Sequence, residues 1–142
     1  KLADFRPLLE TDHTFVNLQA GHGVDQLDDP DLPGAIIRFP EITASIADNT
    51  KRMVDCAALI ACLDLVITVD TAIAHLAGAL GKPVWMLTAK VPYWVYMLEG
   101  DRTPWYSTMR LFRTQQRYDW SGPVSEMKAL LDGGDPLGEA SS

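Results

Sequence analysis

The chain has 142 residues, of which 47% are hydrophobic and 22% are charged, and its formal net charge is −7. This length and composition fit one globular domain with a substantial core, and the acidic balance argues against a nucleic-acid partner. A helix N-terminus can still hold a phosphate group without net positive charge. The apolar runs are short and are interrupted by Asp64, Asp70 and His75, so we expect no membrane span.

The N-terminal part is predicted to hold helices and short strands in alternation. Apolar residues at helical spacing predict a helix from Leu2 to Leu9. Short apolar runs predict strands over 15–18 and 35–39, separated by a turn-rich loop over 21–34. A further helix is expected over 55–63, whereas 43–51 is ambiguous.

The centre of the chain is the most informative part. Residues 65–69 form a nearly continuous apolar run, which is typical of a strand buried on both faces of a parallel sheet. A helix is expected over 72–80, with Gly81 as its C′ residue, followed by a strand over 83–87. These elements predict a compact, right-handed β-α-β unit.

The C-terminal part adds a short helix over 94–98, a strand over 109–113 and a helix over 124–131. Alternating strands and helices predict an α/β three-layer sandwich with a mainly parallel sheet. The domain is expected to span 1–132 and to be followed by a flexible tail over 133–142, rich in Gly, Pro and Ser. Ligands of such sheets bind beyond the carboxyl ends of the strands.

The turn from Asp70 to His75 is one such strand end. The start of a helix offers unpaired N–H groups and a partial positive charge, and small residues at Ala72 and Ala74 would let a phosphate approach the backbone. Thr71 adds a hydroxyl, and His75 falls about one turn into the helix. From the spacing alone, an ordinary N-cap and a structural histidine are the favoured interpretation.

A resemblance changes that interpretation. The stretch from Leu63 to Trp85 is similar to the nucleotide-sugar-binding half of GT-B glycosyltransferases. It is most similar to the heptosyltransferase-like domain that often follows tetratricopeptide repeats in bacterial proteins. Weaker matches lie at 15–19, 103–106 and 110–113. The resemblance implies a Rossmann-like fold, half of a GT-B enzyme. The two cysteines of the chain, Cys56 and Cys62, are poorly placed on one helix to form a bridge, which fits a reducing, cytoplasmic setting.

The resemblance also implies a site and a reaction. A donor diphosphate and sugar would be bound at Asp70, Thr71, Ala72, Ile73 and His75, with the phosphate on backbone N–H groups. The reaction would transfer a sugar from a nucleotide diphosphate to an acceptor hydroxyl, with no cofactor and no protein-bound metal. No catalytic residue is identified in this chain.

The chain departs from the family pattern at several positions. Tyr93-Trp94-Val95-Tyr96 stands where the family has an Asp-Trp-Arg-Trp-like run. Arg52 and Cys56 stand where the family has Asp and Thr. The family's first strand and its acceptor-binding half are not in this sequence. We therefore expect an acceptor-binding domain and tetratricopeptide repeats in a longer parent chain, inactivity of this chain alone, and self-association through an unpaired sheet edge.

Further residues have weaker claims. Glu41, Trp105 and Tyr106 are candidates for base or sugar contacts, although a loop carboxylate and loop-packing aromatics are the simpler interpretation. Arg110 and Arg113, expected on an edge strand, are more simply solvated or paired with acidic groups than bound to phosphate.

The alternative function is a non-catalytic nucleotide-binding or protein-interaction module. Another α/β enzyme has little support, because no nucleophile-elbow or phosphate-loop motif occurs in the sequence.

Overall fold

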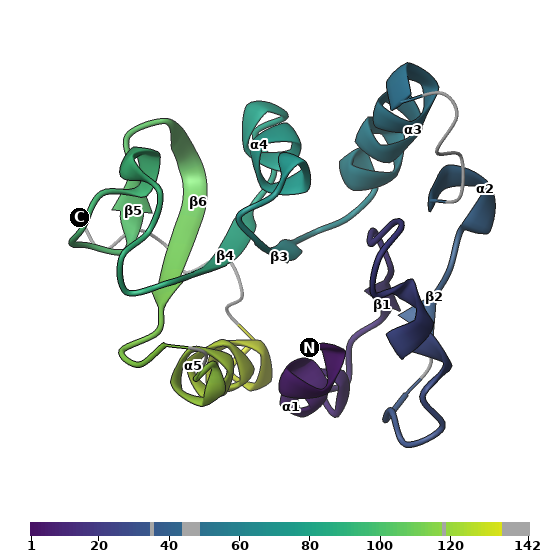
Figure 1. Cartoon of the computed structure of the whole chain (residues 1–142), viewed down its shortest axis with the longest axis horizontal. Helices are drawn as coiled ribbons and strands as arrows, with labels where there is room; N and C mark the ends of the chain where they lie inside the picture. The colour runs from purple at the N-terminus through teal and green to yellow at the C-terminus, as the bar shows by residue number, and fades with distance from the viewer. Residues whose placement is uncertain (35, 44–48, 118, 135–142) are drawn as a thin grey trace.

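The structure is a computed structural model that describes residues 1–34, 36–43, 49–117 and 119–134. Helices cover both faces of a set of mainly parallel strands, so the predicted α/β three-layer class is confirmed (Figure 1). The helices are η1 (Leu2–Phe5), α1 (Arg6–Leu9), η2 (Val24–Asp28), α2 (Pro40–Thr43), α3 (Asn49–Ala61), α4 (Ala72–Ala79), η3 (Trp94–Tyr96) and α5 (Ser121–Asp132). The strands are β1 (Phe15–Val16), β2 (Ile36–Ile37), β3 (Val66–Val69), β4 (Val84–Thr88), β5 (Arg102–Thr103) and β6 (Tyr106–Arg113).

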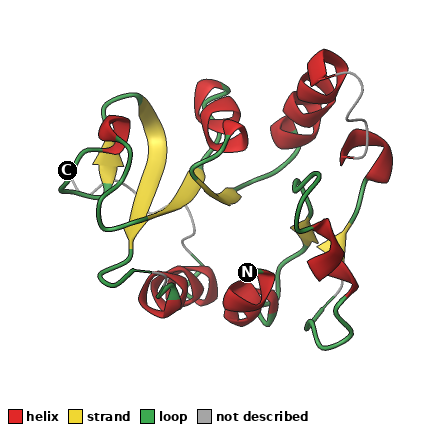
Figure 2. Ribbon diagram, in the orientation of Figure 1, coloured by secondary structure: helices red, strands yellow, loops and turns green. Residues whose placement is uncertain are grey.

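The larger sheet has four strands in the order β3-β4-β6-β5 (Figure 2). The strands β3, β4 and β6 are parallel, with Val66 opposite Val84 and Val84 opposite Met109. All five residues of β4 are buried, so β4 is the centre of the core. The antiparallel strand β5 was not predicted, because two residues are too few for a hydrophobic pattern.

The smaller sheet consists of β1 and β2, paired in parallel with Phe15 opposite Ile36. Within the residues that the structure describes, it is not hydrogen-bonded to the larger sheet. Side chains nevertheless join the two sheets, because Phe15 packs against the same hydrophobic cluster as Ile67 of β3. The predicted parallel sheet is thus divided into two parts between β1 and β3.

The prediction that 65–69 is buried on both faces is wrong. The strand β3 is the last strand in the order of the larger sheet, and only Val66 is fully buried. Val69 is 41% exposed. The apolar run correctly predicted a strand, but the run alone does not reveal whether a second neighbour is present.

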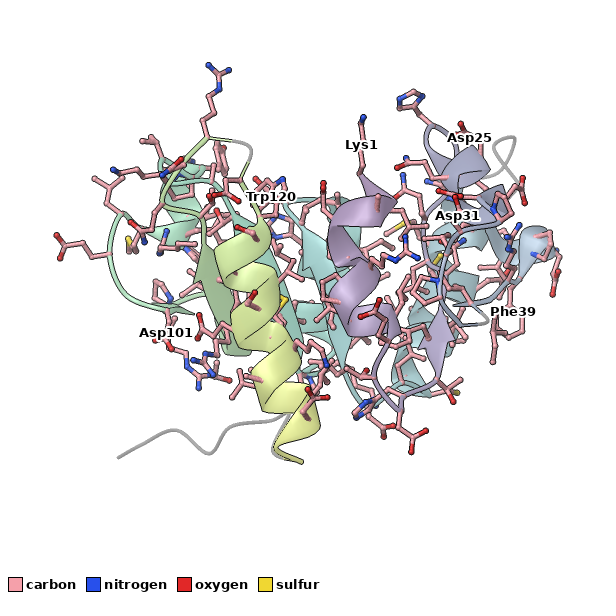
Figure 3. All side chains as sticks on the ribbon, turned by 90° about the horizontal axis from the view of Figure 1, so that it is seen from below. Lys1, Asp25, Asp31, Phe39, Asp101 and Trp120 are labelled. Atoms are coloured by element: carbon pink, nitrogen blue, oxygen red, sulfur yellow. The ribbon has the colours of Figure 1, made fainter. Side chains whose placement is uncertain are left out.

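The core lies in two layers, because alternate side chains of β4 point to opposite faces. One layer packs under α3 and α4 and includes Ile60, Ala74, Ala77, Val84, Met86 and Tyr96. The other packs under α1 and α5 and includes Leu8, Trp85, Leu87, Phe112, Val124 and Met127. Figure 3, seen from the second face, shows α1 and α5 lying next to each other across the strands.

The remaining boundaries differ modestly from the predictions. The helix expected over 55–63 runs instead from Asn49 to Ala61, and the strand expected over 109–113 begins at Tyr106. The final helix begins at Ser121 rather than 124. The helix expected over 94–98 is the short η3. Most of the expected tail, 135–142, lies outside the described residues.

Candidate functional site

The turn between β3 and α4 leaves backbone donors exposed at the carboxyl end of the sheet. Thr71 is the N-cap residue, but its side chain makes no capping hydrogen bond and lies 3.2 Å, oxygen to oxygen, from Thr68 Oγ1. Thr71 and Ala72 are exposed. The N–H groups of Ala72 and Ile73 have no acceptor among the described residues, as expected for the first turn of a helix. This turn can therefore donate hydrogen bonds to an anion.

Hydrogen bonds join four side chains beside this turn, which we call the four-residue network: Asp70, His75, Tyr96 and Tyr106. The Tyr96 hydroxyl donates to Asp70 Oδ1 at 3.0 Å and lies 3.2 Å from His75 Nε2. On the other side of the imidazole ring, Nδ1 lies 3.0 Å from the Tyr106 hydroxyl. The network joins the β3–α4 turn, α4, η3 and the start of β6.

The network is half inside the protein. Tyr96 is only 1% exposed, whereas the Asp70 and His75 side chains are 46% and 42% exposed. Burial and the hydrogen bond to Asp70 raise the pKa of the Tyr96 phenol above its usual value, so this group stays protonated. The buried, protonated phenol of Tyr96 thus holds the more exposed carboxylate of Asp70 by a hydrogen bond from the protein interior.

Ring packing fixes the network in place. The His75 ring is stacked on Tyr96, with centroids 6.1 Å apart, and meets Tyr106 edge-on at 5.8 Å. Gly78 of α4 lies directly against Tyr106, because an added Cβ would come within 2.6 Å of the tyrosine Cγ. Gly78 therefore allows α4 to pack closely on β6.

The structure brings some predicted site residues together and separates others. Asp70, Thr71, Ala72, Ile73, His75 and Tyr106 gather around one strand end. Ile73 packs its side chain into the core, so only its backbone faces the turn. Glu41 is exposed on α2, beyond the smaller sheet (Figure 1). Trp105 contacts Trp94 edge-on at 5.9 Å rather than joining the network.

Trp105 belongs instead to an exposed apolar surface, which we call the aromatic patch: Val91, Tyr93, Trp94, Met97, Leu98 and Trp105. These side chains are between 48% and 77% exposed. An open groove of about 710 Å³ lies among Pro92, Trp94, Met97, Leu98 and Glu99. Exposed apolar side chains gathered in this way are typical of a binding surface.

Arg113 holds the loop that carries the aromatic patch. Its guanidinium donates to the backbone carbonyls of Tyr96 at 2.5 Å, Gly100 at 2.7 Å and Met97 at 3.1 Å. The prediction of an edge strand here is wrong, because β6 lies between β4 and β5. Arg113 thus binds carbonyl groups of its own chain.

Arg110 pairs with acidic groups, as the simpler of the two interpretations of the sequence predicted. It is paired with two carboxylates, Asp101 at 3.3 Å and Glu126 at 2.9 Å. Neither arginine of β6 points to a role in phosphate binding.

Two further features of the described residues bear on function. No group of three or more His, Cys, Asp or Glu side chains is arranged to hold a metal ion in the part of the chain that the structure describes. Nor does any helix in the described ranges have the length and hydropathy needed to cross a membrane.

Sequence reasoning missed Tyr96 as a member of the site. Its partners Asp70 and His75 are 26 and 21 residues away in the sequence, so no local pattern joins them. The one available signal was the departure of 93–96 from the family pattern, which places a tyrosine hydroxyl in this loop.

Comparisons with known proteins agree with the central part of this picture. Residues 43–88, which include β3, α4 and β4, match the family model of glycosyltransferase family 9 (heptosyltransferase). The chain is also 35% identical over 129 residues to Protein FlbA of Caulobacter vibrioides. That match covers 89% of this chain and 21% of FlbA, so the chain spans about a fifth of its relative's length. The β3–α4–β4 unit and the turn within it are therefore heptosyltransferase-like.

Proposed function

We propose that this chain is the donor-binding half of a glycosyltransferase that transfers a sugar from a nucleotide diphosphate to an acceptor hydroxyl. One observation carries the proposal. The segment that matches glycosyltransferase family 9 contains the β3–α4 turn, where exposed backbone donors lie beside a fixed carboxylate. The phosphates of a nucleotide-sugar could accept hydrogen bonds from the backbone donors, and one of its hydroxyls could donate to the carboxylate.

The chemistry of the turn suits a leaving diphosphate. The N–H groups of Ala72 and Ile73 and the hydroxyl of Thr71 would bind phosphate oxygens, assisted by the partial positive charge at the start of α4. Preorganised donors of this kind stabilise the negative charge that develops as the diphosphate departs. Asp70 would accept a hydrogen bond from a hydroxyl of the donor, because a carboxylate repels phosphate.

In our proposal, the transfer reaction also needs parts of a longer protein that lie outside this chain. An acceptor-binding part, with tetratricopeptide repeats in the same cytoplasmic protein, would bring the second substrate to the turn. We also propose that the domain gains a first strand from a preceding segment, which would pair with the unpaired edges of β1 and β3. We propose no metal or cofactor for the transfer.

Nucleotide titration tests the donor site. Amide resonances of residues 71–74 should shift on adding ADP, GDP or UDP to the labelled protein. Ala72→Pro removes one N–H at the first helical position, where proline fits the helix and follows the extended backbone of Thr71. We expect it to weaken nucleotide binding.

Ala72→Ser is the matched control, because it keeps the N–H group and should retain binding. Shifts confined to another face at saturating nucleotide, or equal affinity of Ala72→Pro and the unaltered chain, would contradict the donor site.

A second function has one observation in its favour. The aromatic patch is large, exposed and held by Arg113, which suits a protein-interaction module without catalytic activity. Two results together would favour this function over the first. Nucleotides would cause no shift of the amide resonances, and the Trp94→Ala variant would no longer bind a protein that the unaltered chain binds.

A further inference from the structure

We propose that Tyr96 is a positioning residue that aims Asp70 at a hydroxyl of the bound donor, with His75 held as its Nε2–H tautomer by Tyr106. This inference rests on the proposed donor site and adds to it the side chains that hold Asp70 in position. It assigns a role to Tyr96, which lies in the segment 93–96, where this sequence differs from the Asp-Trp-Arg-Trp-like run of the family.

The hydrogen bonds of the network can run in only one direction when His75 is neutral. An ionised Asp70 has no proton, so the Tyr96 hydroxyl must donate to it. A hydroxyl has one proton, so the Tyr96 oxygen accepts from His75 Nε2–H. The other ring nitrogen, Nδ1, then accepts from the Tyr106 hydroxyl.

The consequence for Asp70 is that its two oxygens differ. Oδ1 is held by Tyr96 and lies 3.9 Å from His75 Nε2. Oδ2 has no hydrogen-bond partner among the residues that the structure describes, and the side chain is 46% exposed. One oxygen is therefore fixed from inside while the other remains able to accept a hydrogen bond from outside.

Packing makes this arrangement rigid. Tyr96 is 1% exposed, its ring stacks on His75, and its carbonyl oxygen accepts from Arg113. Tyr106 packs against Gly78, where an added Cβ would lie 2.6 Å from the tyrosine Cγ and would force the ring or the helix to move. A carboxylate held this way loses little conformational freedom when a ligand binds, which favours affinity for a correctly placed hydroxyl.

The charges at the turn decide which part of a ligand goes where. Phosphate groups are drawn to the N–H groups of Ala72 and Ile73 and are repelled by Asp70. The ligand group facing Asp70 Oδ2 must therefore be a hydrogen-bond donor. In a nucleotide-sugar the hydroxyls of the ribose and of the transferred sugar are such donors, and we assign Asp70 to the transferred sugar, whose hydroxyls the free diphosphate lacks. Tyr96 should then affect binding of the sugar and leave binding of the diphosphate unchanged.

The first experiment needs no ligand. Long-range ¹H–¹⁵N NMR at a pH well above the usual histidine pKa of about 6.5 reports which ring nitrogen carries the proton. His75→Gln assigns the resonances among the three histidines of the chain. We expect a single Nε2–H tautomer, and loss of the Tyr106 donor in Tyr106→Phe should move the Nδ1 resonance. An Nδ1–H tautomer or an averaged mixture in the unaltered chain would overturn the directed network.

The second experiment compares affinities by calorimetry, using ADP, GDP and UDP beside ADP-glucose, GDP-mannose and UDP-glucose. For the pair that binds, Tyr96→Phe should weaken binding of the sugar conjugate about tenfold, the order expected for one hydrogen bond to a charged group. Binding of the free diphosphate should be unchanged. Tyr93→Phe is the matched control, because Tyr93 lies in the same loop but is 58% exposed and outside the network.

The outcomes separate this inference from the proposed function. Equal binding of the sugar conjugate by Tyr96→Phe and the unaltered chain would overturn the positioning role. If no nucleotide binds at all, the donor site fails and the ligand role of Asp70 fails with it, whereas the tautomer of His75 still decides the network. Should Tyr96→Phe not fold, Tyr106→Phe tests the same network through His75 and should also weaken binding of the sugar conjugate alone.

Discussion

At the scale of single residues, His75 shows how a polar side chain is accommodated at the edge of the core. Both of its ring nitrogens lie within hydrogen-bond distance of tyrosine hydroxyls. Its role in the proposed site is therefore indirect, because it links the Tyr106 hydroxyl to the Tyr96 hydroxyl and so helps to hold Tyr96 in place. The sequence predicted that His75 lies near the turn and that Tyr106 is a candidate site residue, but it predicted neither hydrogen bond to His75 and did not identify Tyr96.

The two cysteines differ in environment and should differ in reactivity. Both are free thiols; Cys56 is 3% exposed and Cys62 is exposed. Burial raises the pKa of the Cys56 thiol, so less of it is thiolate at a given pH, and its reaction with iodoacetamide should be slow. Peptide mapping by mass spectrometry should find the label on Cys62 first.

Unfolding provides the control for this prediction. In concentrated urea both cysteines should react at similar rates. Equal labelling of the two under native conditions would show that α3 opens readily and that Cys56 is not part of a stable core.

At the scale of elements, α4 packs on β6 through one glycine. Gly78→Ala would place a methyl group 2.6 Å from Tyr106 Cγ, so the ring or the helix must move. We expect a loss of about 1–3 kcal/mol in the free energy of unfolding, as for other overpacked contacts. Denaturant titration measures this loss, and the His75 Nδ1 resonance should shift because Tyr106 moves.

Gly122→Ala is the matched control. Gly122 lies in α5, where an added Cβ meets nothing within 4 Å. The stability of that variant should be unchanged or slightly raised, because alanine favours helix. A stable Gly78→Ala variant with an unmoved Nδ1 resonance would contradict the close packing described for α4.

The start of α5 depends on a carboxylate. Asp119 Oδ1 accepts from the backbone N–H of Ser121 at 3.0 Å and from its hydroxyl at 2.6 Å. These bonds lower the pKa of Asp119, so its contribution to stability is present above the usual carboxyl pKa of 3.8 and is lost as pH falls through the folded value. Asp119→Ala should lower Tm at neutral pH, and the difference should vanish in acid.

Thermal unfolding monitored by circular dichroism at several pH values checks this prediction. Asp12→Ala is the control, since Asp12 is exposed and has no hydrogen bond among the described residues. Its effect on Tm should be small at every pH. A Tm difference for Asp119→Ala that persists below the folded pKa would show that the effect does not come from the ionised carboxylate.

Local patterns explain which elements the sequence could predict. The apolar run over 65–69, the helical spacing over 72–80 and the glycine at 81 are contained in short stretches, and β3, α4 and the turn followed from them. The network depends on contacts between residues 21 to 31 positions apart, and Arg113 reaches carbonyls 13 to 17 residues away. The sequence of side chains does not show which backbone carbonyls will face an arginine, so the role of Arg113 in holding the loop could not be predicted.

At the scale of the whole molecule, the notable feature is a sheet in two parts. The strands β1 and β3 each have one hydrogen-bonded neighbour in the described residues, although Phe15 and Ile67 pack against the same cluster. Unpaired edges of this kind are available for pairing with another strand. A preceding segment of a longer protein, as we propose, or a second copy of this chain would supply one.

We therefore expect the isolated chain to self-associate through the β3 edge as concentration rises. Val69 is the exposed residue of that edge, and a lysine on an edge strand opposes pairing with another strand. Val69→Lys should shift the association constant, measured by analytical ultracentrifugation, at least severalfold toward monomer. Val54→Lys is the control, because Val54 is 64% exposed on α3 and lies outside the sheet.

The aromatic patch offers a competing route to association, and one variant separates the two. Leu98 is 70% exposed in that patch and lies outside the strands. If the β3 edge is responsible, Leu98→Lys should associate like the unaltered chain, because strand pairing does not use this side chain. If Leu98→Lys abolishes association while Val69→Lys does not, the patch is the contact surface. The edge prediction would then be wrong, and the interaction-module function would gain support.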